Sequence, residues 1–295
     1  MRTPRLLESL VDRIEGNAAL DAPASALSGV LRKVIRPGAV EDTLSGTPIG
    51  HPLHPLLVAV PIGAWSSSLL LDAVGDEEGA RRLVGLGLVS ALPTAASGAS
   101  DWLSTEGAEK RVGLVHALFN YGAIGMYAAS WFARRAGRRG TGIGCSLAGA
   151  SLLSAGGYLG GHLAYAQGVG VDTTAFQQYP ADWTDALAVD DLPGEDALTS
   201  VQVAGVPVLV TVRAGRPVVM ADRCTHRGAP LHEGSVVDGC VVCPWHDSAF
   251  SLDDGSVQSG PANRPQPLLE TRLHEGRLQV RRADERSLRT NPTGT

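Results

Sequence analysis

Cysteine and histidine side chains form two closely spaced pairs in the C-terminal third of this 295-residue chain. Cys224 and His226 are separated by one residue, and Cys243 and His246 by two. Together they offer two thiolates and two imidazoles, which are good ligands for zinc and for iron. We therefore expect these four residues to hold a metal centre.

The same four ligands suit two different centres. A structural zinc ion takes two cysteines and two histidines in a tetrahedron, but zinc fingers usually pair cysteine with cysteine and histidine with histidine along the chain. Here each half contains one of each, and the surrounding glycines and prolines favour tight loops over a finger helix. A [2Fe–2S] cluster with both thiolates on one iron and both imidazoles on the other uses the same set.

The sequence around the two pairs resembles the Rieske ferredoxin family over roughly residues 185–282. Gly228, Leu231 and Gly234 stand where that family carries them in CTHRGAPLHEG, and Gly260 and Pro261 resemble its proline loop, which covers the cluster. The resemblance implies a [2Fe–2S] cluster in a small all-β domain. It also implies that the cysteines bind the buried iron and the histidines the outer iron, from which an electron would leave.

Several positions depart from the Rieske proteins of respiratory quinol complexes. Ala229 and Trp245 replace the cysteines that form a disulfide there, and Phe250 replaces a tyrosine. Ser248 is retained and is expected to donate to a cluster sulfur. Fewer donors to the sulfurs lower the potential, so we expect the low end of the Rieske range, on the order of −150 mV. Asp247 stands where the family usually has glycine, which leaves the local backbone angle open.

Four long runs without charged side chains lie before residue 172. Each is at least about 18 residues long, enough for a helix to cross a bilayer, and each is rich in glycine, alanine and serine, as in closely packed membrane helices. A soluble bundle would need polar outward faces, which these runs lack. We predict an N-terminal all-α four-helix transmembrane bundle joined to a C-terminal all-β Rieske-type domain. The runs are residues 51–71, 83–100, 112–133 and 140–171.

Ionisable residues gather at one side of this predicted bundle. His51 and His54 begin the first run, His116 is one turn into the third, His162 is near the end of the fourth, and Asp101 ends the second. In an up-down-up-down bundle these positions share one membrane side. Each histidine alone has an ordinary interpretation as an interfacial or hydrogen-bonded residue, but several together indicate a functional site.

Two imidazoles on different helices can ligate a haem iron. His116 and His162 are the expected pair, while His51 and His54 are expected to hold a propionate, a metal or a quinone. The segment GHPLHP at residues 50–55, followed by PIG at 61–63, resembles a family of four-span bacterial membrane domains of unknown function. That resemblance covers roughly residues 45–170; it supports the number of spans and implies no activity.

The pattern predicts five segments in order. Residues 1–44 form an amphipathic tail that either lies on an anionic membrane face or packs as ordinary helices. Residues 45–171 form the transmembrane domain, 172–184 a linker, 185–282 the Rieske domain and 283–295 a disordered tail. Alternating or β-branched runs predict strands in the Rieske domain. The predicted strands are residues 200–203, 206–213, 217–221, 240–243, 249–251, 268–273 and 277–281.

Charge limits the partners and the location. A net charge of −5 gives no reason to expect nucleic acid. Early charged residues interrupt any signal peptide. The basic residues flanking the spans point both ways, so the lack of an export signal decides the expectation. We expect a multi-pass protein of the bacterial inner membrane, in contact with the lipid bilayer, with the Rieske domain on the cytoplasmic side.

The sequence lacks a facial-triad iron site and a nucleotide-binding G-x-G-x-x-G motif, so we do not expect a complete enzyme. The first hypothesis is a membrane-anchored one-electron carrier that exchanges electrons with a b-type haem or quinone in its membrane domain, or with a soluble redox partner. A second makes the Rieske domain a redox-sensing module that regulates a membrane transport or interaction protein. A third makes it the tethered ferredoxin of an oxygenase system, served by a reductase.

Overall fold

The computed structural model describes residues 5–283 and divides the chain into two compact units. Unit 1 consists of Met1–Arg36 and Pro52–Gly170, and unit 2 of Pro37–His51 and Val171–Thr295. The division differs from the expected one, because residues 37–51 belong with the C-terminal unit and not with an N-terminal tail. The expected disordered tail, apart from Ala283, lies outside the described residues.

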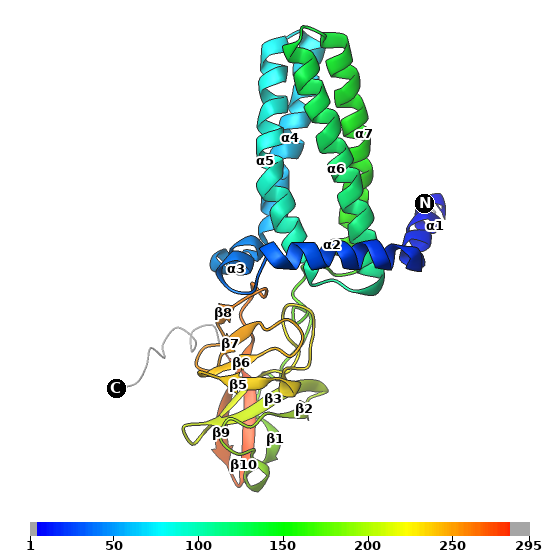
Figure 1. Ribbon diagram of the computed structural model, residues 1–295. Coiled ribbons are helices and arrows are strands. Elements are labelled where there is room, and N and C mark those ends of the chain that lie inside the picture. The colour runs from blue at the N-terminus through cyan, green and yellow to red at the C-terminus, as the bar shows by residue number, and fades with distance from the viewer. Residues whose placement is uncertain (1–4, 284–295) are drawn as a thin grey trace. The chain divides into compact units, whose positions relative to one another are not determined.

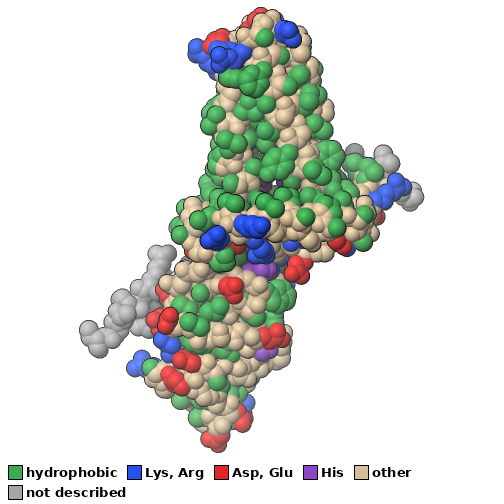
Figure 2. Space-filling view, in the orientation of Figure 1, with side chains coloured by type: hydrophobic (Ala, Val, Ile, Leu, Met, Phe, Trp, Pro, Cys, Tyr) green, Lys and Arg blue, Asp and Glu red, His purple; other side chains and the backbone are tan. Residues whose placement is uncertain are grey.

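Unit 1 is all-helical, as expected (Figure 1). Four of its helices are long and apolar enough to cross a membrane. Apolar side chains such as Leu56, Val89 and Phe132 are exposed on the outward faces of these helices. Figure 2 shows hydrophobic side chains spread over the visible face of the helical unit. The helices are α1 (Arg5–Glu15), α2 (Asp21–Val34), α4 (Leu53–Val74), α5 (Glu77–Leu103), α6 (Gly107–Arg135) and α7 (Arg139–Tyr165), with a 3₁₀ turn at Ala18–Leu20.

The first two helices pack against the long ones. Val11 of α1 is buried in a cluster with Val112 and Leu159, and the Arg111 guanidinium pairs with Asp21 at the start of α2 at 2.6 Å. Arg32 of the basic helix α2 donates to the Leu103 carbonyl at 3.1 Å. These contacts hold α1 and α2 against the bundle; the expected contact with an anionic membrane face stays a prediction.

The four long helices form two hairpins that repeat one another in sequence. The hairpin α6–α7 follows the hairpin α4–α5 at an offset of 62 positions throughout. The turn glycines are equivalent, Gly75 with φ 87° and Gly137 with φ 71°, a left-handed conformation that favours glycine. Identical residues also fall at the pairs His54/His116, Ile62/Ile124, Gly63/Gly125, Ser68/Ser130, Gly87/Gly149 and Gly98/Gly160.

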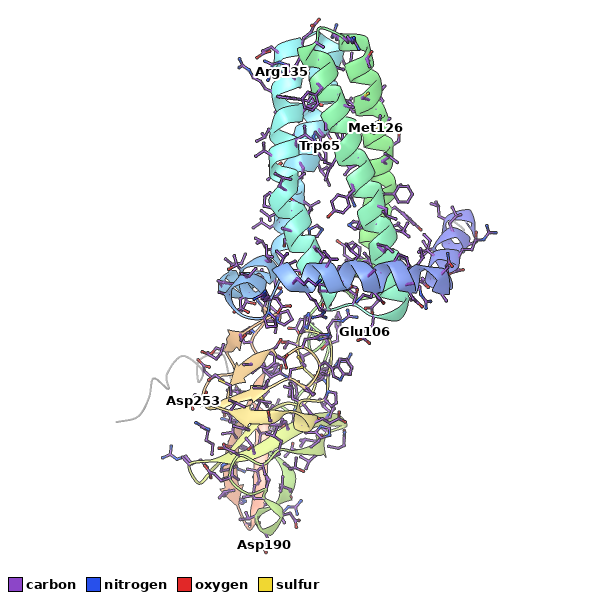
Figure 3. All side chains as sticks on the ribbon, viewed as in Figure 1. Trp65, Glu106, Met126, Arg135, Asp190 and Asp253 are labelled. Atoms are coloured by element: carbon purple, nitrogen blue, oxygen red, sulfur yellow. The ribbon has the colours of Figure 1, made fainter. Side chains whose placement is uncertain are left out.

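Equivalent residues of the two hairpins meet each other in the middle of unit 1. Trp65 (Figure 3) stacks on Tyr127 with ring centroids 4.2 Å apart and planes within 5°. The Asp72 carboxylate receives two hydrogen bonds from Arg134, at 2.7 and 2.6 Å. Contacts between positions related by the repeat indicate an approximate two-fold axis running along the bundle. This repeat was not predicted, although its 62-residue offset is already present in the sequence.

Unit 2 is a β-domain with two antiparallel sheets, which confirms the expected fold class (Figure 1). A six-stranded sheet has the order β1-β10-β9-β4-β3-β2 and a four-stranded sheet the order β5-β6-β7-β8. The strands are β1 (Thr184–Ala188), β2 (Thr199–Val203), β3 (Val206–Arg213), β4 (Arg216–Ala221), β5 (Ser235–Val237), β6 (Cys240–Val242), β7 (Ala249–Ser251), β8 (Val257–Ser259), β9 (Leu268–His274) and β10 (Arg277–Arg282). Short helical segments are α3 (Ala39–Ser45) and 3₁₀ turns at Thr47–Ile49, Val189–Asp191 and Leu231–Glu233.

All seven predicted strands are present, and three others were not predicted. The missed strands β5 and β8 have three residues each, as the predicted strands β6 and β7 do, so an alternating pattern is marginal at this length. The sequence TDALA of β1 has few residues with strong strand preference. These segments become strands because they pair with a neighbouring strand, and this pairing cannot be predicted from the local sequence pattern.

Candidate metal centre

The two ligand loops of unit 2 are built in the same way. One runs from β4 to β5 and the other from β6 to β7. The Cys224 N–H donates to the carbonyl five residues on, at Ala229, and the Cys243 N–H to that of Ser248, both at 2.9 Å. In return, the N–H four residues on, of Gly228 or Asp247, donates to the cysteine carbonyl at 2.9 or 3.2 Å.

The fourth position after each cysteine requires a left-handed backbone. Gly228 has φ 76° and Asp247 has φ 58°. Glycine adopts this region without strain, and aspartate tolerates it better than most side chains do. The structure thus answers the question left open by the sequence, because Asp247 keeps the backbone angle that glycine would adopt.

The fold brings the four expected ligands together and sorts them by type. Cys224 and Cys243 are each 1% exposed, and their thiols hydrogen-bond to each other. The imidazole rings of His226 and His246 are half-buried, with centroids 5.1 Å apart and planes at 79°. Each sequence pair mixes one thiol with one imidazole, whereas the structure places thiol beside thiol and ring beside ring.

Backbone N–H groups prepare the cysteines to bind metal as thiolates. Those of His226 and Arg227 donate to the Cys224 sulfur, and those of Trp245 and His246 donate to the Cys243 sulfur. The hydrogen bond from the Cys224 thiol lowers the pKa of Cys243, and the same bond raises the pKa of Cys224. The pair therefore shares a proton that a bound metal would displace, since the thiolate is the ligand form.

The His226 imidazole is also in the form that binds metal. Burial, with smaller contributions from the charges of His246 and Arg227, lowers the pKa of His226 to about 3, so its ring is neutral at pH 7. The Nδ1 atom of His226 is buried and has no hydrogen-bond partner among residues 5–283. A buried ring nitrogen without a partner is costly unless something binds it, which suits a ligand position.

The arrangement fits two metal atoms better than one. A tetrahedral zinc ion needs its four ligands around a single point. A thiol pair beside an imidazole pair suits a [2Fe–2S] cluster, in which each iron takes two protein ligands.

A second set of residues holds the first ligand loop, and the sequence analysis did not identify it. The buried Gln266 amide donates to the carbonyls of Ala221 and Arg223 at 2.8 Å each, and its oxygen accepts from the Thr225 N–H at 3.2 Å. The Asp222 carboxylate, 4% exposed, accepts from the His232 backbone at 2.9 Å. These partners are distant in the sequence and carry no local motif.

The proline loop at Gly260 and Pro261 is held from both sides. The Ser248 hydroxyl accepts from the Ala262 N–H at 3.0 Å. From the segment before the first span, Thr47 donates to the Ala262 carbonyl at 2.8 Å, and Asp42 accepts from the Gly260 N–H at 2.7 Å. Residues 37–51 therefore support the ligand-loop end of unit 2, a role that the predicted N-terminal tail did not include.

Ser248 offers a direct test of how the loops control the potential. Because its oxygen accepts from Ala262, its own proton is available for a cluster sulfur. A hydrogen bond to a charged group contributes about 1.5–3 kcal/mol, so Ser248→Ala is expected to lower the midpoint potential by about 60–130 mV. Protein-film voltammetry measures this shift. Ser248→Thr keeps the hydroxyl and should stay near the wild-type value; an equal drop in both variants would show that packing, and not the donor, sets the potential.

The membrane histidines form a different pair in the structure from the one that the sequence predicted. His54 and His116 face each other with ring centroids 6.5 Å apart and planes at 83°. Their Nδ1 atoms lie 3.0 Å from the Thr94 carbonyl oxygen and 2.7 Å from that of Gly156. The structure thus brings His54 beside His116, where the sequence analysis expected His162.

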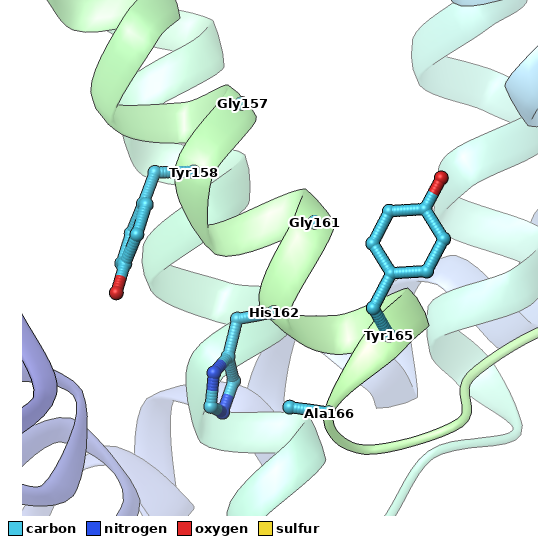
Figure 4. A pocket seen from close by; sticks show the side chains of 6 residues that line it. All are labelled: Gly157, Tyr158, Gly161, His162, Tyr165 and Ala166. Atoms are coloured by element: carbon cyan, nitrogen blue, oxygen red, sulfur yellow. The ribbon is translucent and has the colours of Figure 1, made fainter. Parts of the chain in front are cut away.

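His162 lies in a different environment. Its Nε2 atom is 2.8 Å from the Glu15 carboxylate of α1. It lines a shallow, open pocket of about 400 Å³ together with Tyr158 and Tyr165, whose side chains flank it in Figure 4. His51 is exposed before α4 begins and is grouped with unit 2. Asp101 lies in the last turn of α5, where its backbone carbonyl accepts from Ser104.

Family models match both halves of the chain and agree with the fold of each. A family model described as the Rieske [2Fe-2S] domain matches residues 182–278, and one described as predicted membrane protein (DUF2231) matches residues 50–173. The anthranilate 1,2-dioxygenase ferredoxin subunit of Burkholderia cepacia is 31% identical over 101 residues, which are 34% of this chain and 92% of that protein.

Two further relatives have different settings. The cytochrome b6-f complex iron-sulfur subunit 2 of Nostoc sp. is 31% identical over 136 residues, covering 40% of this chain and 75% of that protein. A solved complex of reduced oxygenase and oxidised ferredoxin in carbazole 1,9a-dioxygenase aligns with 27% identity and a TM-score of 0.33, covering 35% of this chain and 97% of the matched one. The chain therefore belongs to the Rieske [2Fe–2S] family through its C-terminal domain, and it carries in front of it a domain of the DUF2231 family of predicted membrane proteins.

Proposed function

We propose that this chain is a membrane-anchored one-electron carrier whose Rieske centre accepts an electron from one redox partner and passes it to another. The sorting of the ligands carries this proposal: the two cysteines are fully buried side by side, whereas the two histidines lie together and are partly exposed. When bound, a [2Fe–2S] cluster supplies a reversible one-electron couple. The protein's own residues hold it, limit solvent access and leave one side open to a partner.

The exposed side offers a docking point for a soluble protein. Trp245 precedes the ligand His246 and is 55% exposed, and aromatic side chains are enriched at protein interfaces. Similarity to the ferredoxin subunit of a dioxygenase over 92% of its length favours a reductase or an oxygenase component as that partner. This is the tethered-ferredoxin form of the proposal.

The attachment of unit 2 favours exchange with the membrane unit as well. Thr47, just before α4, is fixed on the proline loop. Thr173, shortly after α7, donates to the Cys224 carbonyl at 2.7 Å. Both chain segments that continue into the helical unit are therefore anchored at the ligand-loop end of unit 2. A haem or a quinone held by the membrane histidines would be the second redox site of this proposal.

A reductive titration of the detergent-purified full chain tests the carrier function. With NADH and the ferredoxin reductase of an oxygenase system, the visible spectrum should bleach with one electron per cluster and recover on reoxidation. A cluster that neither these donors nor quinols reduce would contradict the proposal.

We also propose that the chain lies in a bacterial inner membrane with unit 2 on the cytoplasmic side. Protease should then digest unit 2 in inside-out vesicles but not in intact spheroplasts.

A further inference from the structure

We infer that the membrane unit binds one b-type haem, with the Nε2 atoms of His54 and His116 as its axial ligands. This inference rests on the proposed function, for which it would provide the second redox site. It replaces the pair His116 and His162 with a pair that the repeat of the two hairpins makes equivalent. It also separates the His54–His116 pair, which would bind the cofactor, from the Trp65–Tyr127 and Asp72–Arg134 pairs, which hold the hairpins together.

Both rings are oriented by the same backbone contact. His54 and His116 each place Nδ1 next to a carbonyl oxygen 40 residues further along the chain, at Thr94 and Gly156. A carbonyl can only accept, so each Nδ1 carries the proton and each Nε2 keeps its lone pair. Histidines that bind metals usually donate their other ring N–H in this way, which fixes the tautomer and the ring orientation.

Glycines on the partner helices leave the space that the rings occupy. A Cβ atom at Gly98 would lie 2.8 Å from the His54 ring, and one at Gly160 would lie 2.9 Å from the His116 ring. These glycines are equivalent in the repeat. The Asn120 amide nitrogen is 3.2 Å from Nε2 and 3.4 Å from Nδ1 of His116, so it lies over the ring and not on the axis of the Nε2 lone pair.

Three pairs of equivalent residues lie between the two hairpins: the histidine layer of His54 and His116, the aromatic layer of Trp65 and Tyr127, and the ion-pair layer of Asp72 and Arg134. The aromatic layer is closed by rings 4.2 Å apart, whereas the histidine rings are 6.5 Å apart. The ion-pair layer is closed by the Asp72–Arg134 hydrogen bonds. Of these three pairs only the histidines offer ligand nitrogens, and their ring centroids lie farther apart than those of Trp65 and Tyr127.

The ligand count selects the cofactor. Within residues 5–283, no third His, Cys, Asp or Glu completes a site for a single ion with these two histidines. A bare transition-metal ion would therefore have two protein ligands only. A haem iron receives four nitrogens from its macrocycle and needs just two axial imidazoles, and the apolar helices around the layer suit a porphyrin.

Haem analysis of the full chain, expressed with a haem precursor, tests the site. We expect one haem per chain by pyridine haemochrome assay and an α-band in the reduced-minus-oxidised spectrum. His54→Ala and His116→Ala should each lower the haem content at least tenfold. His51→Ala and His162→Ala, matched histidines outside the pair, should leave it unchanged. Absence of haem from the wild type, or equal loss in all four variants, would overturn the assignment.

Two further variants separate ligation from a structural role. Methionine also serves as an axial haem ligand and raises the potential, so His54→Met and His116→Met should retain haem and shift its potential upward. Helical circular dichroism and the cluster's EPR signal verify folding in every variant. The inference is wrong if the methionine variants fold but lose haem. It is also wrong if solvent extraction of the purified protein yields a quinone that depends on His54 and His116, and no haem. A cluster signal without haem would overturn this site alone, whereas haem without a cluster would overturn the carrier function.

Discussion

Cys243→Ser is expected to abolish the iron–sulfur cluster and with it the cluster's EPR signal and its share of the visible absorbance. The two thiols lie 1% exposed beside each other, and each iron of the centre would take two of the four side chains. Losing one ligand leaves an iron with an open position in a buried site, and metal affinity is coupled to folding of the loops. Cys224→Ser, His226→Ala and His246→Ala should have the same effect, a loss of at least tenfold in acid-labile sulfide per chain.

Matched controls lie in the same domain. Cys240, three residues before Cys243, is a free thiol, half-buried on β6, and His274 is exposed at the end of β9. Cys240→Ser and His274→Ala should retain full iron content and the wild-type EPR signal. Retention of the cluster in a ligand variant, with loss in a control, would reassign the centre.

Asp72→Asn is expected to destabilise the membrane unit by about 3–5 kcal/mol, the usual cost of leaving one partner of a buried ion pair unpaired. The side chains of Asp72 and Arg134 are only 6% and 3% exposed. Arg134 also donates to Ser130 at 3.0 Å, so its guanidinium is held where no other described carboxylate pairs with it. The measurement is the thermal unfolding midpoint of the helical signal in detergent.

The repeat provides the control for this prediction. Because Asp72 and Arg134 are equivalent positions, the double variant Asp72→Arg/Arg134→Asp should recover much of the lost stability. Glu78→Gln breaks an exposed pair with Arg81 on the same unit and should leave the unfolding midpoint almost unchanged, because solvent screens such pairs. If Asp72→Asn is no more harmful than Glu78→Gln, the ion pair does not hold the two hairpins together.

The metal centre could be predicted from local sequence, but its support could not. Cys224, His226 and the second pair lie within short motifs, so their types and spacing indicate the chemistry directly. The contact of Gln266 with Ala221 spans 45 residues, and that of Asp42 with Gly260 spans 218. Such partners are brought together only by the pairing of strands and loops, which no local pattern records.

The membrane unit shows the same limit in another form. Length and apolar composition predicted the four long helices, since crossing a bilayer imposes both. The partner of His116 depends on which helix faces which, and four apolar helices of similar composition do not specify that. The equivalence of His54 and His116 would have predicted the pair, because repeated hairpins place equal positions at a shared axis.

The most direct test of the account is elemental analysis of freshly purified full-length protein. The [2Fe–2S] centre predicts two iron atoms and two acid-labile sulfides per chain, in addition to any haem iron, together with an EPR signal on one-electron reduction. One zinc ion per chain, with neither sulfide nor colour, would contradict it and return the four ligands to a structural site.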